Sequence, residues 1–140
     1  MFKEKSEEEA LIEFLSDWKD DPMDTKRVFE SLFRQLSAMQ DSLLGFNARP
    51  GITYSLRAGK QEKAERPLYV MVDVIDDDPE GRWLSVCFYG DSVEDPEELG
   101  DLIPGGLLGE DGYCFDLYGY DEKTLSYICR RIDEARSYMG

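Results

Sequence analysis

Apolar residues recur with helical spacing at both ends of the chain. A pattern that repeats every three to four residues is typical of an amphipathic helix that buries one face. Three such stripes occur. The first, in residues 7–19, consists of Leu11, Phe14, Leu15 and Trp18. The second, in residues 28–43, consists of Val28, Phe29, Leu32, Phe33, Leu36, Met39 and Leu43, and the third, near the C-terminus, consists of Leu125, Ile128, Cys129, Ile132 and Ala135. The pattern predicts three helices, the second of which should end near Gly45 because glycine commonly terminates helices.

The middle of the chain follows a strand-like pattern instead. Residues 52–58, "ITYSLRA", alternate between apolar and polar, and residues 68–75, "LYVMVDVI", are apolar at nearly every position. Residues 82–90, "RWLSVCFYG", place Leu84, Val86 and Phe88 on one face, and residues 113–120, "YCFDLYGY", form a similar run. These segments predict four strands.

The connection between the last two predicted strands contains a further helix signal. In "DPEELGDLI", residues 95–103, Asp95 and Pro96 are residue types that are favoured at the start of a helix, aspartate at the N-cap and proline at the first helical position. The following "PGGLLGEDG", residues 104–112, is typical of a loop. The predicted element order is therefore ααβββαβα.

This order predicts one α+β domain over residues 1–140, with a mostly antiparallel four-stranded sheet and helices packed on it. Residues 1–22 form an N-terminal helical extension in this prediction.

An acidic stretch between two predicted strands resembles the beginning of a calcium-binding loop. Asp76, Asp78, Glu80 and Gly81 match positions 1, 3, 5 and 6 of such a loop. Position 12, which requires a bidentate glutamate, is Cys87, and a strand rather than a helix follows. "DDDPEG" therefore predicts a hairpin turn, and Asp76, Asp78 and Glu80 are at most a weak cation site at its tip.

The net charge of the chain is −15, and it is concentrated in one segment. Residues 73–122 contain 16 of the 31 acidic residues but only one of the 16 basic ones. This charge disfavours nucleic acid and anionic membranes as partners, because both are bound mainly through cationic side chains. It permits a basic protein or cations, although it also suits a small domain that is merely kept soluble.

Several residues of this segment could form a partner surface. They are Asp91, Glu94, Asp101, Leu107, Leu108, Glu110 and Asp111. Three of them, Asp91, Glu94 and Asp101, have no evident structural role. The oligomeric state stays open, as does the role of the basic stretch from Arg57 to Arg66, which could pair with acids of a neighbouring subunit.

Catalytic and cofactor motifs are weak in this sequence. Histidine is absent, which removes the usual general base and the commonest zinc ligand. Neither GxxxxGK[ST] nor GxGxxG occurs, so we expect no cofactor, and the sequence favours a protein without enzymatic activity. A carboxylate-based hydrolase would need a concave pocket and an acid with a raised pKa.

The three cysteines are Cys87, Cys114 and Cys129, and none forms a CxxC pair. We expect them to be buried and reduced. The first residues lack the apolar core of a secretory signal, and no apolar run is long enough to span a membrane, so we expect a cytoplasmic protein.

From the second predicted helix onward, the order of elements resembles that of small bacterial YdhG-like α+β domains. The segments that carry the resemblance are "RPGITYSLRAG", "RPLYVMVDVI", "RWLSVCFYG", "DPEEL" and "GYCFDLYGYDEKTLSYICRRIDEARSYM". One branch of that family is described as a frataxin-like iron chaperone. The resemblance implies an α+β fold, but it provides no set of site residues.

Two functional hypotheses follow. In the first, the protein is a non-catalytic interaction or regulatory domain that presents the acidic face of residues 73–122 to a basic partner. In the second, it handles a divalent metal of the iron type with surface carboxylates. The second requires acidic side chains that converge on one point.

Overall fold

The computed structural model describes residues 1–60, 66–78 and 80–139. These residues form three helices and six strands. Their order is α1 (Lys5–Asp17), α2 (Thr25–Ser37), β1 (Ser42–Arg49), β2 (Thr53–Lys60), β3 (Val70–Ile75), β4 (Trp83–Tyr89), β5 (Asp101–Leu107), β6 (Glu110–Leu117) and α3 (Glu122–Tyr138). No helix in this part of the chain is long and apolar enough to cross a membrane.

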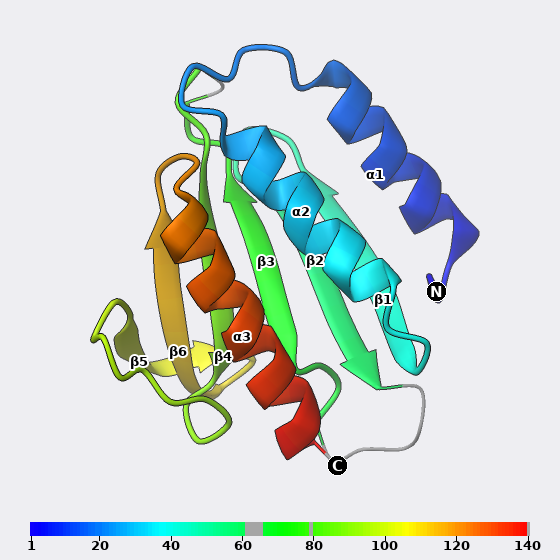
Figure 1. The fold of residues 1–140 in the computed structure, drawn as a ribbon. Coiled ribbons are helices and arrows are strands. Elements are labelled where there is room, and N and C mark those ends of the chain that lie inside the picture. Colours follow the sequence, from blue (N-terminus) through cyan, green and yellow to red (C-terminus); the bar gives the residue numbers. More distant parts are fainter. Residues whose placement is uncertain (61–65, 79, 140) are drawn as a thin grey trace.

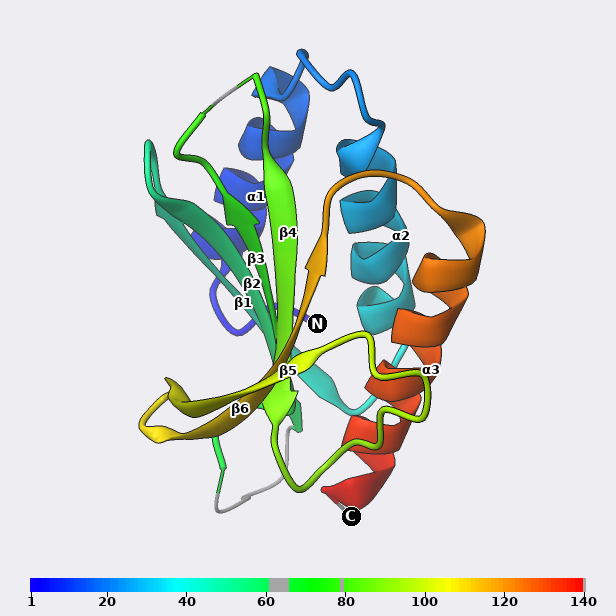
Figure 2. The same ribbon diagram turned by 90° about the vertical axis from the view of Figure 1, so that its left-hand side faces the viewer.

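The strands form one antiparallel sheet in the order β1-β2-β3-β4-β6-β5. Helices α2 and α3 lie side by side across one face, and α1 continues this layer at the β1 edge (Figure 1). The hairpin of β5 and β6 bends away from the helices (Figure 2). We refer to the face of the sheet turned away from the helices as the open face. The α+β class and the antiparallel sheet are confirmed.

The predicted count of four strands is wrong, and one reason lies at β1. Helix α2 ends at Ser37 rather than near Gly45, and Ser42, Leu44 and Phe46 alternate inward on a strand. The apolar residues at positions 39 and 43 fitted a continuing helix as well as a turn and a strand. Residues 42–49 form a strand rather than a continued helix because they pair with β2 along eight residues.

The second reason is β5, where a short helix and a loop were predicted. Residues 95–100 form turns, with the backbone N–H of Glu98 donating to the carbonyl of Asp95. Gly105, Leu108 and Gly109 adopt positive φ angles of 67°, 50° and 87°, which allows a tight return from β5 into β6. The observed order is therefore ααββββββα.

Two apolar clusters stabilise the fold. The larger one lies between the sheet and the three helices and includes Leu11 of α1, Phe29 of α2 and Ile132 of α3. Because Phe14 of α1 stacks on Tyr54 at 4.0 Å between ring centroids, residues of the predicted N-terminal extension belong to the core. The smaller cluster consists of Leu68, Cys87, Tyr89 and Leu107, with Met71 and Cys114 beside it.

The expectation that all three cysteines are reduced is wrong for two of them. Cys87 and Cys114 form a disulfide, because β4 and β6 bring these residues into directly opposite positions. Cys129 is free and half-buried on α3, where burial raises its pKa. A local pattern could not reveal the pairing, since it depends on the register of two strands.

The two edges of the sheet differ. At β1, the backbone N–H of Lys3 donates to Leu44, that of Leu44 donates to Met1, and that of Phe46 donates to the Glu7 carboxylate. These contacts cover part of the edge, and covering an edge strand is one way in which natural proteins prevent unwanted strand pairing. At the other edge, β5 pairs only with β6 among the described residues.

Candidate functional site: an acidic surface around the β5–β6 hairpin

Most residues of the predicted partner surface lie around β5 and its two flanking turns. Asp91, Asp101, Glu110 and Asp111 are exposed there. Leu108 is 54% exposed at the tip of the hairpin, but Leu107 is fully buried in the smaller cluster. Leu107 therefore cannot contact a partner. Glu94 is exposed but lies against α3, where its backbone N–H donates to Glu134.

Apolar side chains are interspersed with these acids. Leu102 and Ile103 of β5 are 53% and 42% exposed, although side chains of this type are usually buried. Five consecutive residues of β5, from Asp101 to Gly105, are exposed. We call the combined patch the acidic hairpin surface, and it consists of Asp91, Asp101, Leu102, Ile103, Leu108, Glu110 and Asp111.

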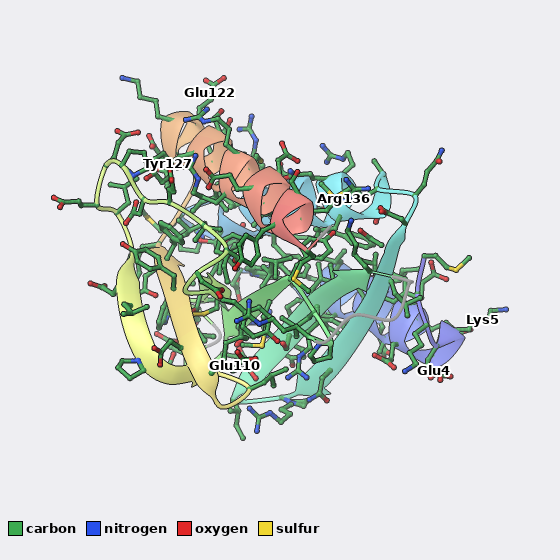
Figure 3. The ribbon with its side chains drawn as sticks, turned by 90° about the horizontal axis from the view of Figure 1, so that it is seen from below. Glu4, Lys5, Glu110, Glu122, Tyr127 and Arg136 are labelled. Atoms are coloured by element: carbon green, nitrogen blue, oxygen red, sulfur yellow. A yellow bond between two sulfur atoms is a disulfide. The ribbon has the colours of Figure 1, made fainter. Side chains whose placement is uncertain are left out.

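A pocket of about 370 Å³ lies within this surface. Its lining residues are Arg66, Gly90, Asp91, Leu102, Glu110 and Asp111. Three carboxylates face one guanidinium, so the pocket has a net negative charge. Glu110 lies at the end of the hairpin, away from α3 (Figure 3).

Arg66 joins the two walls of the pocket. Its Nη1 lies 2.8 Å from Asp91 Oδ1, and its Nη2 lies 3.0 Å from Glu110 Oε1. The guanidinium carbon also lies 4.1 Å from the centroid of the Tyr89 ring. The hydrogen bond from Arg66 holds the pKa of Asp91 below its usual value. Asp111 uses one oxygen to accept the backbone N–H of Gly105, at 3.2 Å.

The loop that leads from β4 to β5 is fixed by Asp95. This carboxylate accepts hydrogen bonds from the hydroxyls of Tyr113 and Tyr127, at 2.7 and 2.5 Å, and from two backbone N–H groups of the loop. Burial alone would raise its pKa, but these hydrogen bonds outweigh burial and lower the pKa to about 2. The hydrogen bond that Tyr113 donates to Asp95 raises the pKa of Tyr113 to about 12. All of these groups have partners, so Asp95 positions the loop.

The predicted cation site at the β3–β4 turn has a different structure. Asp76 is 5% exposed, accepts Arg82 Nε at 2.6 Å and accepts the backbone N–H of Gly51 at 2.9 Å. Asp78 accepts the backbone N–H of Glu80 within the turn. The described residues contain no group of three or more cysteine, aspartate or glutamate side chains that could hold a metal ion.

Two further acids have raised pKa values, on the open face. Burial raises the pKa of Asp73, which lies opposite Ser55 and Ser85 on the neighbouring strands. Burial and the nearby Asp101 raise the pKa of Asp116. Neither acid lines the Arg66 pocket. They therefore do not combine with it into the concave carboxylate site that hydrolysis would require.

A second cavity, of about 550 Å³, lies at the start of α3. Its charged lining residues are Glu97, Glu122, Lys123 and Arg130. Acids and bases balance, so this cavity favours ligands of neither sign. The pocket around Arg66 is the better candidate for selecting a charged partner.

The sequence indicated the acids of this site and a basic stretch, Arg57 to Arg66, that could pair with acids of a neighbouring subunit. It did not reveal the pairing of Arg66 with Asp91 and Glu110 of the same chain, or the disulfide. Arg66 lies outside the acidic segment, and only the fold brings it between Asp91 and Glu110. Comparison with protein families, with curated proteins and with solved structures gave no match to this chain. The resemblance to YdhG-like domains therefore stays a prediction.

Proposed function

We propose that this protein is a non-catalytic interaction domain whose acidic hairpin surface receives a basic segment of a partner protein. The observation that carries the proposal is the net-negative pocket, whose lining includes the 53% exposed Leu102. Such a surface can attract a lysine or arginine electrostatically and bury adjacent apolar side chains. Its charge disfavours nucleic acid and anionic lipid as partners.

The pocket keeps capacity for an added cation although Arg66 occupies part of it. Asp111 points one oxygen at its own turn, and a carboxylate offers further acceptor positions. Glu110 is paired with Arg66 through one oxygen only. An incoming ammonium group would share these acceptors with Arg66, and Leu102, which lines the pocket, would shield one side of the contact from water.

The test uses a fluorescent synthetic peptide of alternating lysine and leucine, and a counterpart with glutamate in place of lysine. We expect the lysine peptide alone to bind, and its affinity to fall at least about tenfold when salt rises from about 0.01 M to about 1 M, because salt screens exposed charges. Fluorescence anisotropy measures the affinity of each peptide and its dependence on salt. Equal binding of the two peptides would overturn the proposal.

A charge-matched pair of variants locates the site. Glu110→Gln with Asp111→Asn removes two charges from the surface but retains hydrogen-bond acceptors. Glu8→Gln with Glu9→Gln removes two charges from exposed positions of α1. We expect the first pair to weaken binding at least about fivefold, since close charge pairs contribute strongly to interfaces, and the second pair to have less than half that effect.

The proposal keeps the cytoplasmic location that the sequence favours. Stable disulfides are rare in that compartment, where such bonds are usually transient, catalytic or redox-sensing. Fractionation of cells that express the tagged protein tests the location.

A further inference from the structure

We propose that the Cys87–Cys114 disulfide is a redox switch for the acidic hairpin surface. In the oxidised protein the bond holds the hairpin in the arrangement that binds a basic segment, and reduction loosens the hairpin and weakens binding. This inference rests on the proposed function, because it concerns the regulation of the same surface.

The position of the bond supports this role. Cys87 and Cys114 are directly opposed on β4 and β6, with Cα atoms 4.1 Å apart. On the other side of β6, Asp101 of β5 lies opposite Cys114. The bond therefore connects the central sheet to β6 at the level where β5 begins.

The chain segment that the bond closes is the candidate site itself. Residues 88–113 contain the loop after β4, the whole of β5 and the hairpin turn. Every residue of the acidic hairpin surface lies in this segment. A covalent link across its ends restricts the open conformations available to the segment.

Strand β5 is attached to the sheet through β6, which is itself paired with β4. Most of β5 is exposed, and only Leu107 of that strand is fully buried. Leu107 packs in the small cluster that contains Cys87. Segments with little buried apolar surface open most readily, so the disulfide and the Arg66 pairs hold a weakly packed element.

The chemistry requires a thiol reductant, such as a low-molecular-weight cellular thiol. Its thiolate attacks Sγ of Cys114, which is more exposed than the 5% exposed Cys87, and Cys87 leaves as a thiolate. A second thiol, as its thiolate, attacks the reductant sulfur of this mixed disulfide and releases Cys114 as a thiolate. Both cysteine thiolates take up the protons that the two reductant thiols gave up, and the reductant ends as its own disulfide. Ser85 Oγ, 3.5 Å from Cys87 Sγ, can donate to the leaving thiolate.

Cys129 does not compete in this exchange. It lies on α3 and packs against the larger core, whereas Cys87 belongs to the small cluster. The sheet separates the two clusters, and burial raises the Cys129 pKa, which lowers its thiolate fraction.

Hydrogen exchange of the oxidised and the dithiothreitol-reduced protein tests the switch without a partner. We expect exchange in residues 101–112 to accelerate at least about tenfold on reduction, within the range that closing such a loop provides, while α2 and α3 change little. Cys87→Ala with Cys114→Ala should exchange like the reduced protein, and Cys129→Ala should keep the redox difference. Equal exchange of the two redox forms would overturn the switch, whatever the binding result.

Binding of the lysine–leucine peptide supplies the second measurement. We expect reduction to weaken it at least about fivefold through loss of a preformed surface, and re-oxidation to restore it. Equal binding in both redox states, with faster exchange in one, would overturn the switch but leave the proposed function intact. Absence of binding in either state would overturn the proposed function and the regulation built on it.

Discussion

At the scale of single residues, Asp95 shows how one carboxylate can organise a loop. It was predicted to cap a short helix, and it does accept backbone N–H groups, those of Leu99 and Gly100. The hydroxyls of Tyr113 and Tyr127, on β6 and α3, complete its hydrogen bonding. Because these tyrosines are distant in sequence, the loop is fixed to two layers of the fold at once.

Asp95→Asn should destabilise the protein by about 1–3 kcal/mol, since an amide loses charge-assisted bonds and directs its own donors at other donors. Urea unfolding measures the change, and Glu98→Gln, an exposed position in the same loop, is the control. An effect of Asp95→Asn no larger than that of the control would contradict this role.

The same variant should alter the pH dependence. The folded-state pKa of Asp95, about 2, lies below its ordinary value of 3.8. The contribution of Asp95 to the free energy of unfolding is therefore present above pH 4 and is lost as the pH falls toward about 2. The stability difference between wild type and Asp95→Asn should shrink over this window.

Tyr113, with a pKa raised to about 12, contributes stability that is lost as the pH rises from 10 toward 12.

At the scale of elements, the two edges of the sheet differ in how far they are covered by other parts of the chain. The β1 edge is covered in part by residues 1–3 and by Glu7, whose Oε1 accepts the backbone N–H of Phe46 at 2.7 Å. The β5 edge carries exposed apolar residues and acids. Pro104 and the irregular register after Ile103 discourage simple strand addition there, so recognition at β5 relies on side chains.

Glu7→Ala should destabilise the protein by about 1–2 kcal/mol and promote self-association, because it removes a charge-assisted hydrogen bond and exposes a strand edge. Urea unfolding and sedimentation measure the two effects. Glu8→Ala removes the same charge from the next, exposed position and should leave both nearly unchanged. Equal behaviour of the two variants would show that edge protection is unimportant.

At the scale of the whole molecule, the charge of −15 opposes compaction. The acids of residues 73–122 are held close together by the sheet, while much of the compensating positive charge lies elsewhere in the chain. The ion pairs of Arg66 and Arg82 neutralise only part of the excess.

The thermal unfolding midpoint should therefore rise when salt increases from about 0.01 M to about 1 M, because the Debye length shortens from about 30 Å to about 3 Å. Calorimetry of the oxidised protein measures this change. The Glu110→Gln, Asp111→Asn variant should respond less steeply than wild type. A midpoint that falls with salt would indicate that specific ion pairs outweigh general repulsion.

Most helices and strands could be read from the sequence because their signals are local. Apolar spacing located α1, the start of α2, α3 and four of the strands. Alternation correctly placed Leu84, Val86 and Phe88 on one face of β4, and the structure shows that this face packs in the larger core. The turn at "DDDPEG" was correctly predicted to join two antiparallel strands. Backbone preference and amphipathic period are properties of neighbouring residues, so a single segment carries them.

The remaining features required the tertiary structure. Residues 42–49 become a strand by pairing with β2, and residues 101–107 become one by pairing with β6. The disulfide, the Arg66 pocket and the Asp95 network each join residues from segments that the sequence keeps apart. Sequence alone therefore determined the local elements and where the charge is concentrated. Register and packing decided which acids form a surface, because both depend on contacts between distant parts of the chain.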